Sequence, residues 1–351
     1  MDVKPCPHGS LSEVERATRG LERVLDFSAS CHPFGACPGV LRALATVEPS
    51  RYPDDRCLAL RRAVAAQVDV PLESVVVGNG SVELIYLLAT AYLRLGDRVL
   101  IVGPTFGEYA RAAAIQGATV AHWLASEEQG FAPDTVDIAR TIAETSPRLV
   151  FLCNPNNPTG RYLRRAAVTV ILEACRESLL VVDEAYLPFV EAGDSLLDLV
   201  GDDLVLLRSL TKDHGLAGLR LGYAVTVGGV AEALMKVKMP WSVNVAAQTA
   251  GLAALADGEH LARGKAEVGA AKSYLTTELS RLGLHVLPSA ANFLLVRVGD
   301  SASFCEGVLR RGCCVRDCGS FGLPQYVRIG MRPLPECRRL VAATEEYLHG
   351  C

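Results

Sequence analysis

Short apolar runs alternate with longer segments of helical periodicity over the first two-thirds of the chain. Five short runs are bounded by Gly, Pro, Asn or Asp and are typical of buried strands: 75–77, 98–102, 149–153, 179–182 and 204–208. Helical spacing predicts helices over 82–95, 106–117, 134–145 and 163–177, with Ser81 as the candidate N-cap of the first. The alternation predicts an α/β fold whose mainly parallel sheet is covered by helices on both faces.

The pattern changes near residue 245. An Ala- and Leu-rich stretch, 245–282, precedes strand-like segments at 284–287, 293–298 and 326–331, which predicts a second, smaller α+β domain. We therefore expect three parts: a large domain, a small domain, and an N-terminal segment that joins the small domain and covers the site. Their expected bounds are 46–245, 246–351 and 1–45.

Composition narrows the class of protein. Half of the 351 residues are hydrophobic and 21% are charged, which excludes a disordered chain. The formal net charge of -4 argues against nucleic acid or an anionic membrane as partner, and the apolar stretch 84–93 is too short to span a bilayer. The N-terminus lacks signal-peptide features, so we expect a cytoplasmic protein with a small-molecule ligand. The 12 cysteines are scattered and are interpreted as free thiols, and no metal site is expected.

Lys212 and Asp183 carry the chemistry that the sequence suggests. Lys212 follows a buried strand, where loss of water favours the neutral amine of a nucleophile; a surface or ion-paired lysine fits this residue alone equally well. Asp183 ends a very apolar strand, so its carboxylate needs a cation, such as a protonated pyridine nitrogen. An Asp that caps the next turn is the alternative.

Two loops follow strands of the same predicted sheet. Asn154–Gly160, with the sequence NPNNPTG, is either an ordinary turn or a ligand loop. Gly78–Glu83 opens a helix, so its free backbone N–H groups could receive a phosphate. In open α/β sheets, ligands bind at the carboxyl ends of the strands, and both loops are expected there.

In order and spacing, these four segments resemble the fold-type I pyridoxal-phosphate (PLP) enzymes, the aspartate aminotransferase superfamily. Asp183 precedes Lys212 by 29 residues and Arg220 follows it by eight. The resemblance implies PLP as cofactor and a seven-stranded sheet. It implies that Lys212 bonds to the cofactor and moves protons, that Asp183 holds the ring nitrogen protonated, and that Tyr186 assists. The other cofactor-binding residues that it implies are Gly80, Ser81, Val82, Phe106, Asn157, Ser209 and Arg220.

Tyr52 lies in Arg51–Asp54 (RYPD), which resembles the superfamily segment that reaches the neighbouring subunit's cofactor. The resemblance thus implies a homodimer with shared active sites.

Within the superfamily, the chain resembles the L-threonine-O-3-phosphate decarboxylases of cobalamin biosynthesis and, second, the histidinol-phosphate aminotransferases. The first resemblance rests on Pro7–Ser10, Asp26–Gly35, Met239–Asn244, Ala291–Val296 and Tyr326–Arg332. It implies decarboxylation of threonine phosphate to (R)-1-amino-2-propanol O-2-phosphate. The alternatives are an aminotransferase of the histidinol-phosphate type and a decarboxylase of a related substrate such as O-phosphoserine or phosphonoalanine.

The substrate residues expected from this resemblance include two anion sites. Arg328 is expected to take a carboxylate, and the candidates for the substrate phosphate are Arg316, His8 and Arg332. Ser30 and Asn157 complete the set. The chain departs from the decarboxylase pattern at Ser10, Ser30, His32 and Asp213–His214, around the substrate rather than the cofactor.

Overall fold

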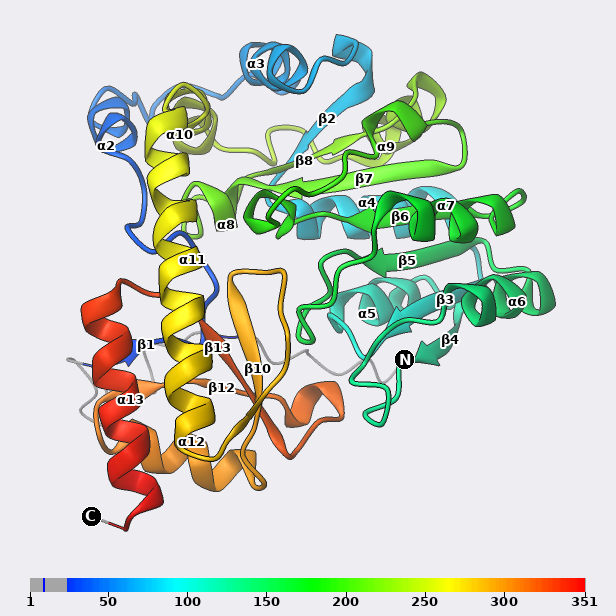
Figure 1. Cartoon of the computed structure of the whole chain (residues 1–351). Coiled ribbons are helices and arrows are strands. Elements are labelled where there is room, and N and C mark those ends of the chain that lie inside the picture. Colours follow the sequence, from blue (N-terminus) through cyan, green and yellow to red (C-terminus); the bar gives the residue numbers. More distant parts are fainter. Residues whose placement is uncertain (1–8, 10–23, 351) are drawn as a thin grey trace.

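The computed structural model describes residue 9 and residues 24–350, and its centre is a seven-stranded sheet (Figure 1). β8 runs antiparallel to the other six strands, which are parallel to one another. In spatial order the strands are β2 (Val75–Gly78), β8 (Gly222–Val225), β7 (Leu204–Ser209), β6 (Leu179–Asp183), β5 (Leu149–Cys153), β3 (Arg98–Gly103) and β4 (Thr119–Leu124). The predicted sheet and its five strands are confirmed.

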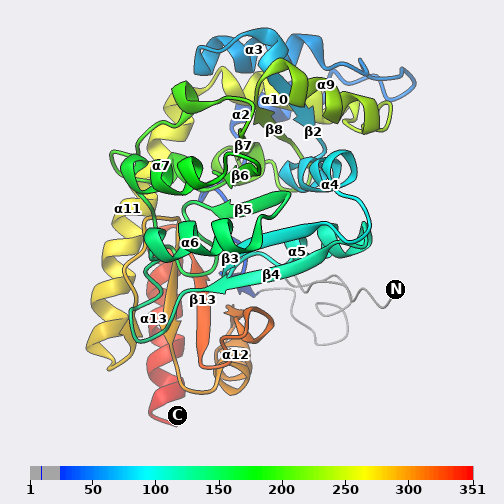
Figure 2. The ribbon, with the colours of Figure 1, turned by 90° about the vertical axis from the view of Figure 1, so that its right-hand side faces the viewer.

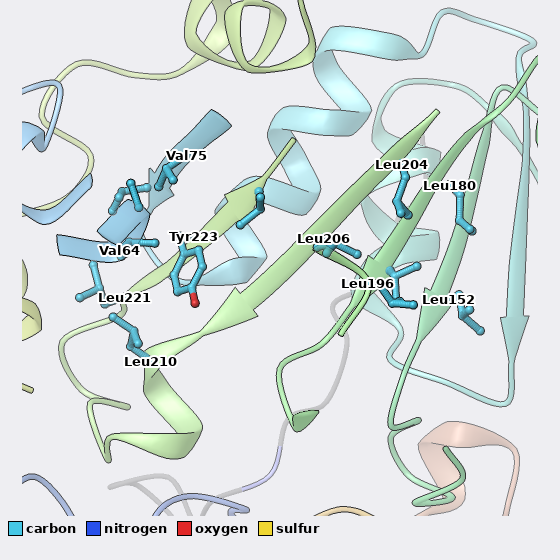
Figure 3. Packing of buried hydrophobic residues seen from close by; sticks show 14 of the residues in the cluster. Val64, Val75, Leu152, Leu180, Leu196, Leu204, Leu206, Leu210, Leu221 and Tyr223 are labelled. Carbon is cyan, nitrogen blue, oxygen red and sulfur yellow. The ribbon is translucent and has the colours of Figure 1, made fainter. Parts of the chain in front are cut away.

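Helices cover both faces of this sheet, since alternate strand residues point to opposite sides (Figures 1 and 2). On β6, Leu180 and Val182 belong to one apolar core, whereas Leu179 and Val181 belong to the other. The first core, part of which Figure 3 shows, includes residues of α2 (Pro38–Leu44), α3 (Leu58–Val68), α6 (Thr135–Thr145), α7 (Arg165–Ala174) and α10 (Val245–Leu255). The second includes residues of α4 (Ser81–Tyr92), α5 (Glu108–Ile115) and α9 (Gly228–Val237).

Ser81 does not cap α4. The N-cap is Gly80, and Ser81 is the first helical residue with no capping side-chain hydrogen bond. The expectation of a Ser81 cap is therefore wrong, and the physical reason is the left-handed backbone of Gly80 (φ 78°), which starts the helix one residue earlier.

A second body, called the small body, is built on an antiparallel sheet in the order β12 (Arg316–Asp317), β13 (Tyr326–Gly330), β10 (Phe293–Arg297) and β9 (His285–Val286). It packs against α11 (Gly258–Arg281), α12 (Ser301–Leu309) and α13 (Leu334–Leu348). The N-terminal strand β1 (Leu25–Asp26) pairs with β11 (Cys313–Cys314). Single-turn 3-10 helices occur at Leu72–Ser74, Leu187–Phe189, Leu197–Leu199 and Gly319–Phe321.

The predicted domain bounds, 46–245 and 246–351, stay predictions. The packing of two helices near these bounds can still be described. Helices α2 and α10 lie on the far sides of the bounds 45 and 245, yet Val40, Ala247 and Ala250 pack into the core of the large sheet. The large body, meaning the seven-stranded sheet with its helices, thus includes both.

The ten cysteines of the described part are all free, and seven are buried. Within residues 24–350 no group of three or more His, Cys, Asp or Glu side chains could hold a metal ion. The same part contains no helix long and apolar enough to cross a bilayer.

Candidate active site

A cavity of about 530 Å³ opens at the carboxyl ends of β5, β6 and β7 and extends to the small body. It brings together most of the residues singled out in the sequence. Those that line it are Ser30, Ser81, Val82, Phe106, Asn157, Asp183, Tyr186, Ser209, Lys212, Arg220, Arg316 and Arg328. We call the wall formed by the large body the cofactor side, and the wall formed by residues 29–31, 316, 320–321 and 328 the substrate side.

Lys212 stands on the cofactor side, in the short helix α8 (Leu210–Asp213) that directly continues β7. Its Nζ lies 5.9 Å from the centre of the Tyr186 ring, which packs edge-on against Phe293. Around it, the hydroxyls of Ser209 and Thr211 share a 2.6 Å hydrogen bond. The end of β7 thus places the amine of Lys212 at a defined position in the cavity.

Asp183 is the last residue of β6 and is buried. The Tyr109 hydroxyl donates to its Oδ2 at 2.7 Å, and the Ala185 N–H donates to Oδ1 at 3.0 Å. Burial raises the pKa of this carboxyl, while Tyr109, the Ala185 N–H and the charge of Lys212 act the other way. No cation lies within ion-pair distance of Asp183 in the described residues, so the carboxylate is suited to a positively charged ligand atom.

An anion cradle lies where α4 begins. A Cβ on Gly80 would stand 2.9 Å from Arg220 Nη2, and one on Gly222 would stand 2.5 Å from the Ser81 backbone nitrogen. Only glycine therefore lets the Arg220 turn, β8 and the first turn of α4 approach so closely. Free N–H groups at a helix start, with a guanidinium beside them, are suited to a phosphate.

Hydrogen bonds within the loop after β5 hold it in place, and its residue Asn157 lines the cavity. Asn154 exchanges two hydrogen bonds with the Leu163 backbone, and Asn156 donates to Pro104 O and to the Thr159 hydroxyl. The buried Asn157 accepts a hydrogen bond from Arg328 Nη1, so this loop links the two sides of the cavity.

Arg316 and Arg328 dominate the substrate side. They are directly opposite each other in the antiparallel pair of β12 and β13, where like charges repel. Burial and the charge of Arg328 lower the pKa of Arg316. Arg328 is buried and donates to Ser28 O and Asn157, but its Nε has no partner and it makes no ion pair within the described residues. Two guanidiniums held together in this way favour an anionic ligand.

Three expected site residues do not line the cavity. Gly80 lies just behind it, under Arg220. Tyr52 is 81% exposed and packs against Trp241 on the outer surface, with the two rings tilted by 33°. Arg332 lies two residues before α13 and pairs with Glu336 in the first turn of that helix, so the charge expected to bind the substrate is already paired with a carboxylate. His8 and Ser10 lie outside the described residues.

Sequence reasoning missed several lining residues, above all Tyr109, Thr211, Cys31, Ser320 and Phe321. Tyr109 was visible as an aromatic residue three positions after Phe106, hence close to it on a helical turn. Residues 320–321 sit in a 3-10 turn after β12, and no local signal marks them.

Comparisons with known proteins decide the family. Residues 23–343 match the model described as "Aminotransferase class I and II". The chain belongs to the class I and II aminotransferase family. It is 38% identical over 352 residues to a histidinol-phosphate aminotransferase of Symbiobacterium thermophilum, covering 99% of this chain and 96% of that protein. A histidinol-phosphate aminotransferase of Moorella thermoacetica is 34% identical over 99% of this chain and 92% of its own length.

Solved structures of family members agree in fold. Histidinol-phosphate aminotransferase from Sinorhizobium meliloti, solved with pyridoxal-5'-phosphate, superposes with a TM-score of 0.89 at 24% identity, covering 96% of this chain and 94% of that one. L-threonine-O-3-phosphate decarboxylase from Porphyromonas gingivalis gives 0.81 at 27% identity, covering 92% and 99%. The resemblance to fold-type I enzymes is thus confirmed.

The chain is a PLP-dependent enzyme of this family, and its cavity fits that cofactor. The glycine cradle with Arg220 suits the phosphate, and the buried Asp183 carboxylate suits a protonated ring nitrogen. Lys212 lines the same cavity and would supply the amine that bonds to the cofactor's aldehyde. The individual cofactor contacts expected of Phe106, Asn157 and Tyr186 stay predictions.

Proposed function

We propose that the protein is an aminotransferase of the histidinol-phosphate type, which moves an amino group between a small phosphorylated amine and a 2-oxo acid. The observation that carries the proposal is the pair Arg316–Arg328 on the substrate side, in a chain whose histidinol-phosphate aminotransferase relatives match it over nearly its whole length. This was the second of the two activities expected from the sequence, and the relatives favour it over the first.

When bound, PLP supplies an electron sink for the bond broken at the substrate Cα. The chain's own residues do the rest. The amine of Lys212 stands free in the cavity to take a proton from the substrate and to return it. Asp183, fixed by Tyr109, would supply the negative charge that keeps the cofactor's ring nitrogen protonated.

Arg316 and Arg328 fix the far end of the substrate. The same guanidinium pair suits the phosphate of one substrate and a carboxylate of the other, because both anions accept paired N–H donors. The Phe321 ring lies 5.8 Å from the Arg316 guanidinium, within cation–π distance. We assign Ser30, whose buried hydroxyl has no partner, to a direct contact with the substrate.

The active site we propose is shared between two copies. Tyr52, Met239 and Trp241 are large apolar side chains left 50–81% exposed on the outer surface of the large body. A partner subunit would cover this patch and receive Tyr52 at its cofactor phosphate. A cytoplasmic location, expected from the sequence, stays a prediction.

Decarboxylation of threonine phosphate is the second candidate, favoured by the sequence motifs and by the fold neighbour that carries out this reaction. The two reactions differ in which bond at Cα stands perpendicular to the cofactor ring.

The deciding experiment uses purified, PLP-loaded protein with each substrate separately. Histidinol phosphate plus 2-oxoglutarate should yield glutamate, and threonine phosphate should yield no CO2. Stoichiometric CO2 from threonine phosphate, with no glutamate formed from histidinol phosphate, would reject the proposal. Arg316→Lys and Arg328→Lys, both of which keep the charge, should raise KM for the phosphorylated amine.

A further inference from the structure

Three histidines meet just outside the cavity wall, where residues 30–36 pass between α8 and α11. They are His32, His214 at the end of α8, and His260 in the first turn of α11, and all three are buried. Two of them, His32 and His214, stand at positions where the chain departs from the decarboxylase pattern. The proposed function gives none of them a role.

Hydrogen bonds fix the charge state of His32. The Phe34 N–H donates to His32 Nδ1 at 3.3 Å, so Nδ1 carries no proton. His32 Nε2 then donates to His260 O at 3.2 Å. The ring also stacks on His260, with centroids 4.3 Å apart, and His260 Nε2 lies 3.0 Å from Gly35 O. A second proton on His32 would face the Phe34 N–H and break the first bond.

The packing is close where the His32 ring meets α11 and where the end of α8 meets the Gly35 backbone. A Cβ on Gly264 of α11 would stand 1.8 Å from His32 Nε2. A Cβ on Gly215, next to His214, would stand 2.4 Å from the Gly35 carbonyl carbon. The segment that carries Ser30 and Cys31 into the cavity is thus clamped on one side by α11 and on the other by the end of α8.

Burial, followed by the neighbouring imidazoles, lowers the pKa of His32 and of His214 to about 4. The charged groups that face the three rings are Arg263 beside His260, Asp257 at the start of α11, and Asp213, whose Oδ2 is 3.9 Å from His214 Nε2. Asp213 in turn faces Arg208 and Lys265. The carboxylates of Asp257 and Asp213 favour a proton on His214, whereas the Arg263 guanidinium opposes one on His32.

We propose that His32, His214 and His260 are positioning residues for the active site: a junction of three packed imidazoles that holds Ser30 and Cys31 at a fixed place relative to Lys212. His32 is one residue beyond Cys31, and His214 is two residues beyond Lys212, so the junction joins the substrate side to the catalytic amine over a very short chain path. Protonation separates the rings and releases the 30–36 segment.

The sign of the pH effect follows from linkage. Both imidazoles take up protons more readily in the released state, near pH 6.5, than in the closed one. Release is therefore rare above pH 6.5 and becomes more frequent as the pH falls toward 4. Asp213 titrates in the opposite sense, because burial raises its pKa to about 7. Its contribution is the same in the parent and in the His32 variants compared below.

Kinetics give the first test, and this readout rests on the proposed function. His32→Leu loses both hydrogen bonds and should raise KM for the phosphorylated amine about tenfold or more, with kcat changed less. His32→Asn keeps an acceptor for the Phe34 N–H and should stay within about threefold of the parent. Equal KM values in the parent and His32→Leu would contradict the proposal.

Two glycines of α11 provide a matched pair. Gly264→Ala drives a methyl group into the His32 ring and should raise KM as His32→Leu does. Gly269→Ala, on the same helix with nothing within 4 Å of its Cβ, should leave KM unchanged and raise the melting temperature. The same KM for both alanine variants would contradict a positioning role for His32.

Hydrogen exchange of the PLP-loaded protein tests the junction without any substrate, so its outcome is independent of the proposed function. After correction for intrinsic exchange, protection of residues 30–37 should fall about tenfold or more between pH 7 and pH 5 in the parent. The fall should be smaller in His32→Asn, which has one titrating ring fewer. Equal protection at both pH values in the parent, or an equal fall in the two proteins, would overturn the inference.

Discussion

The cofactor side of the cavity is built by the ends of β6 and β7 and the start of α4, all within one sheet and its helices. The substrate side is assembled from parts far apart in the chain: residues 29–31, the strands β12 and β13, and the turn at 319–321. One side depends on the register of one continuous sheet, the other on how two bodies and a clamped segment meet. Substitutions should therefore affect cofactor retention on the first side and substrate affinity on the second.

Lys212→Ala should have the largest effect, because it removes the amine from the cofactor side. We expect kcat to fall by about 10³-fold or more. Borohydride reduction followed by mass spectrometry should fix the cofactor to the Lys212 peptide of the parent and to no peptide of the variant. The exposed Lys236→Ala is the control and should keep parental activity. Turnover at the parental rate in Lys212→Ala would overturn the catalytic assignment.

Arg328→Lys should affect the substrate side. The ammonium cannot reproduce two donors to an anion, so KM for the phosphorylated amine should rise about 10- to 100-fold. The PLP content should stay at one per chain, measured by absorbance after alkaline release. Loss of PLP together with substrate affinity would show that the two sides are not separable.

Gly222→Ala should show the converse. Its new Cβ would stand 2.5 Å from the Ser81 nitrogen and 2.8 Å from Arg208 O, so the anion cradle must open. We expect PLP affinity to fall about tenfold in a titration of the apoprotein, with KM of the loaded enzyme nearly unchanged. Gly228→Ala, with no atom within 4 Å of its Cβ, is the control. Unaltered PLP affinity in Gly222→Ala would speak against the cradle.

The contrast between the cofactor side and the substrate side also explains which features could be predicted from the sequence. The NPNNPTG loop, Asp183 and Lys212 are local signals at the ends of strongly apolar strands, so both the strands and the cofactor side were predictable. The edge strand β4 was not, since half of its residues are only partly buried and the other half are exposed. The short strand β8 was hidden in a glycine-rich segment.

On the substrate side, sequence patterns cannot show which residues meet. Arg316 and Arg328 become partners only through the β12–β13 register, whereas Arg332, four residues later, turns to Glu336. His32, His214 and His260 are brought together by tertiary packing alone. Both the motifs and the histidinol-phosphate relatives lead to PLP, but only the relatives favoured the aminotransferase over the decarboxylase.

Asp213→Asn should have the smallest effect, and it separates stability from function. The Asp213 carboxyl is buried with Oδ1 unpartnered, and burial raises its pKa from 3.8 to about 7. The buried charge of this carboxylate lowers the free energy of unfolding by its full amount above pH 7, and it has no such effect below pH 3.8, where the group is protonated in both states. The variant should therefore melt roughly 2 °C higher at pH 8, with a smaller gain at pH 5. A gain that grows toward acid pH would contradict this assignment.

Product analysis tests the central claim most directly. Loaded protein is given histidinol phosphate and 2-oxoglutarate in one vessel and threonine phosphate in another, and glutamate and CO2 are quantified in both. The account predicts glutamate in the first vessel, equal in amount to the histidinol phosphate consumed, and no CO2 in the second. Release of CO2 from threonine phosphate, without glutamate in the first vessel, would contradict it.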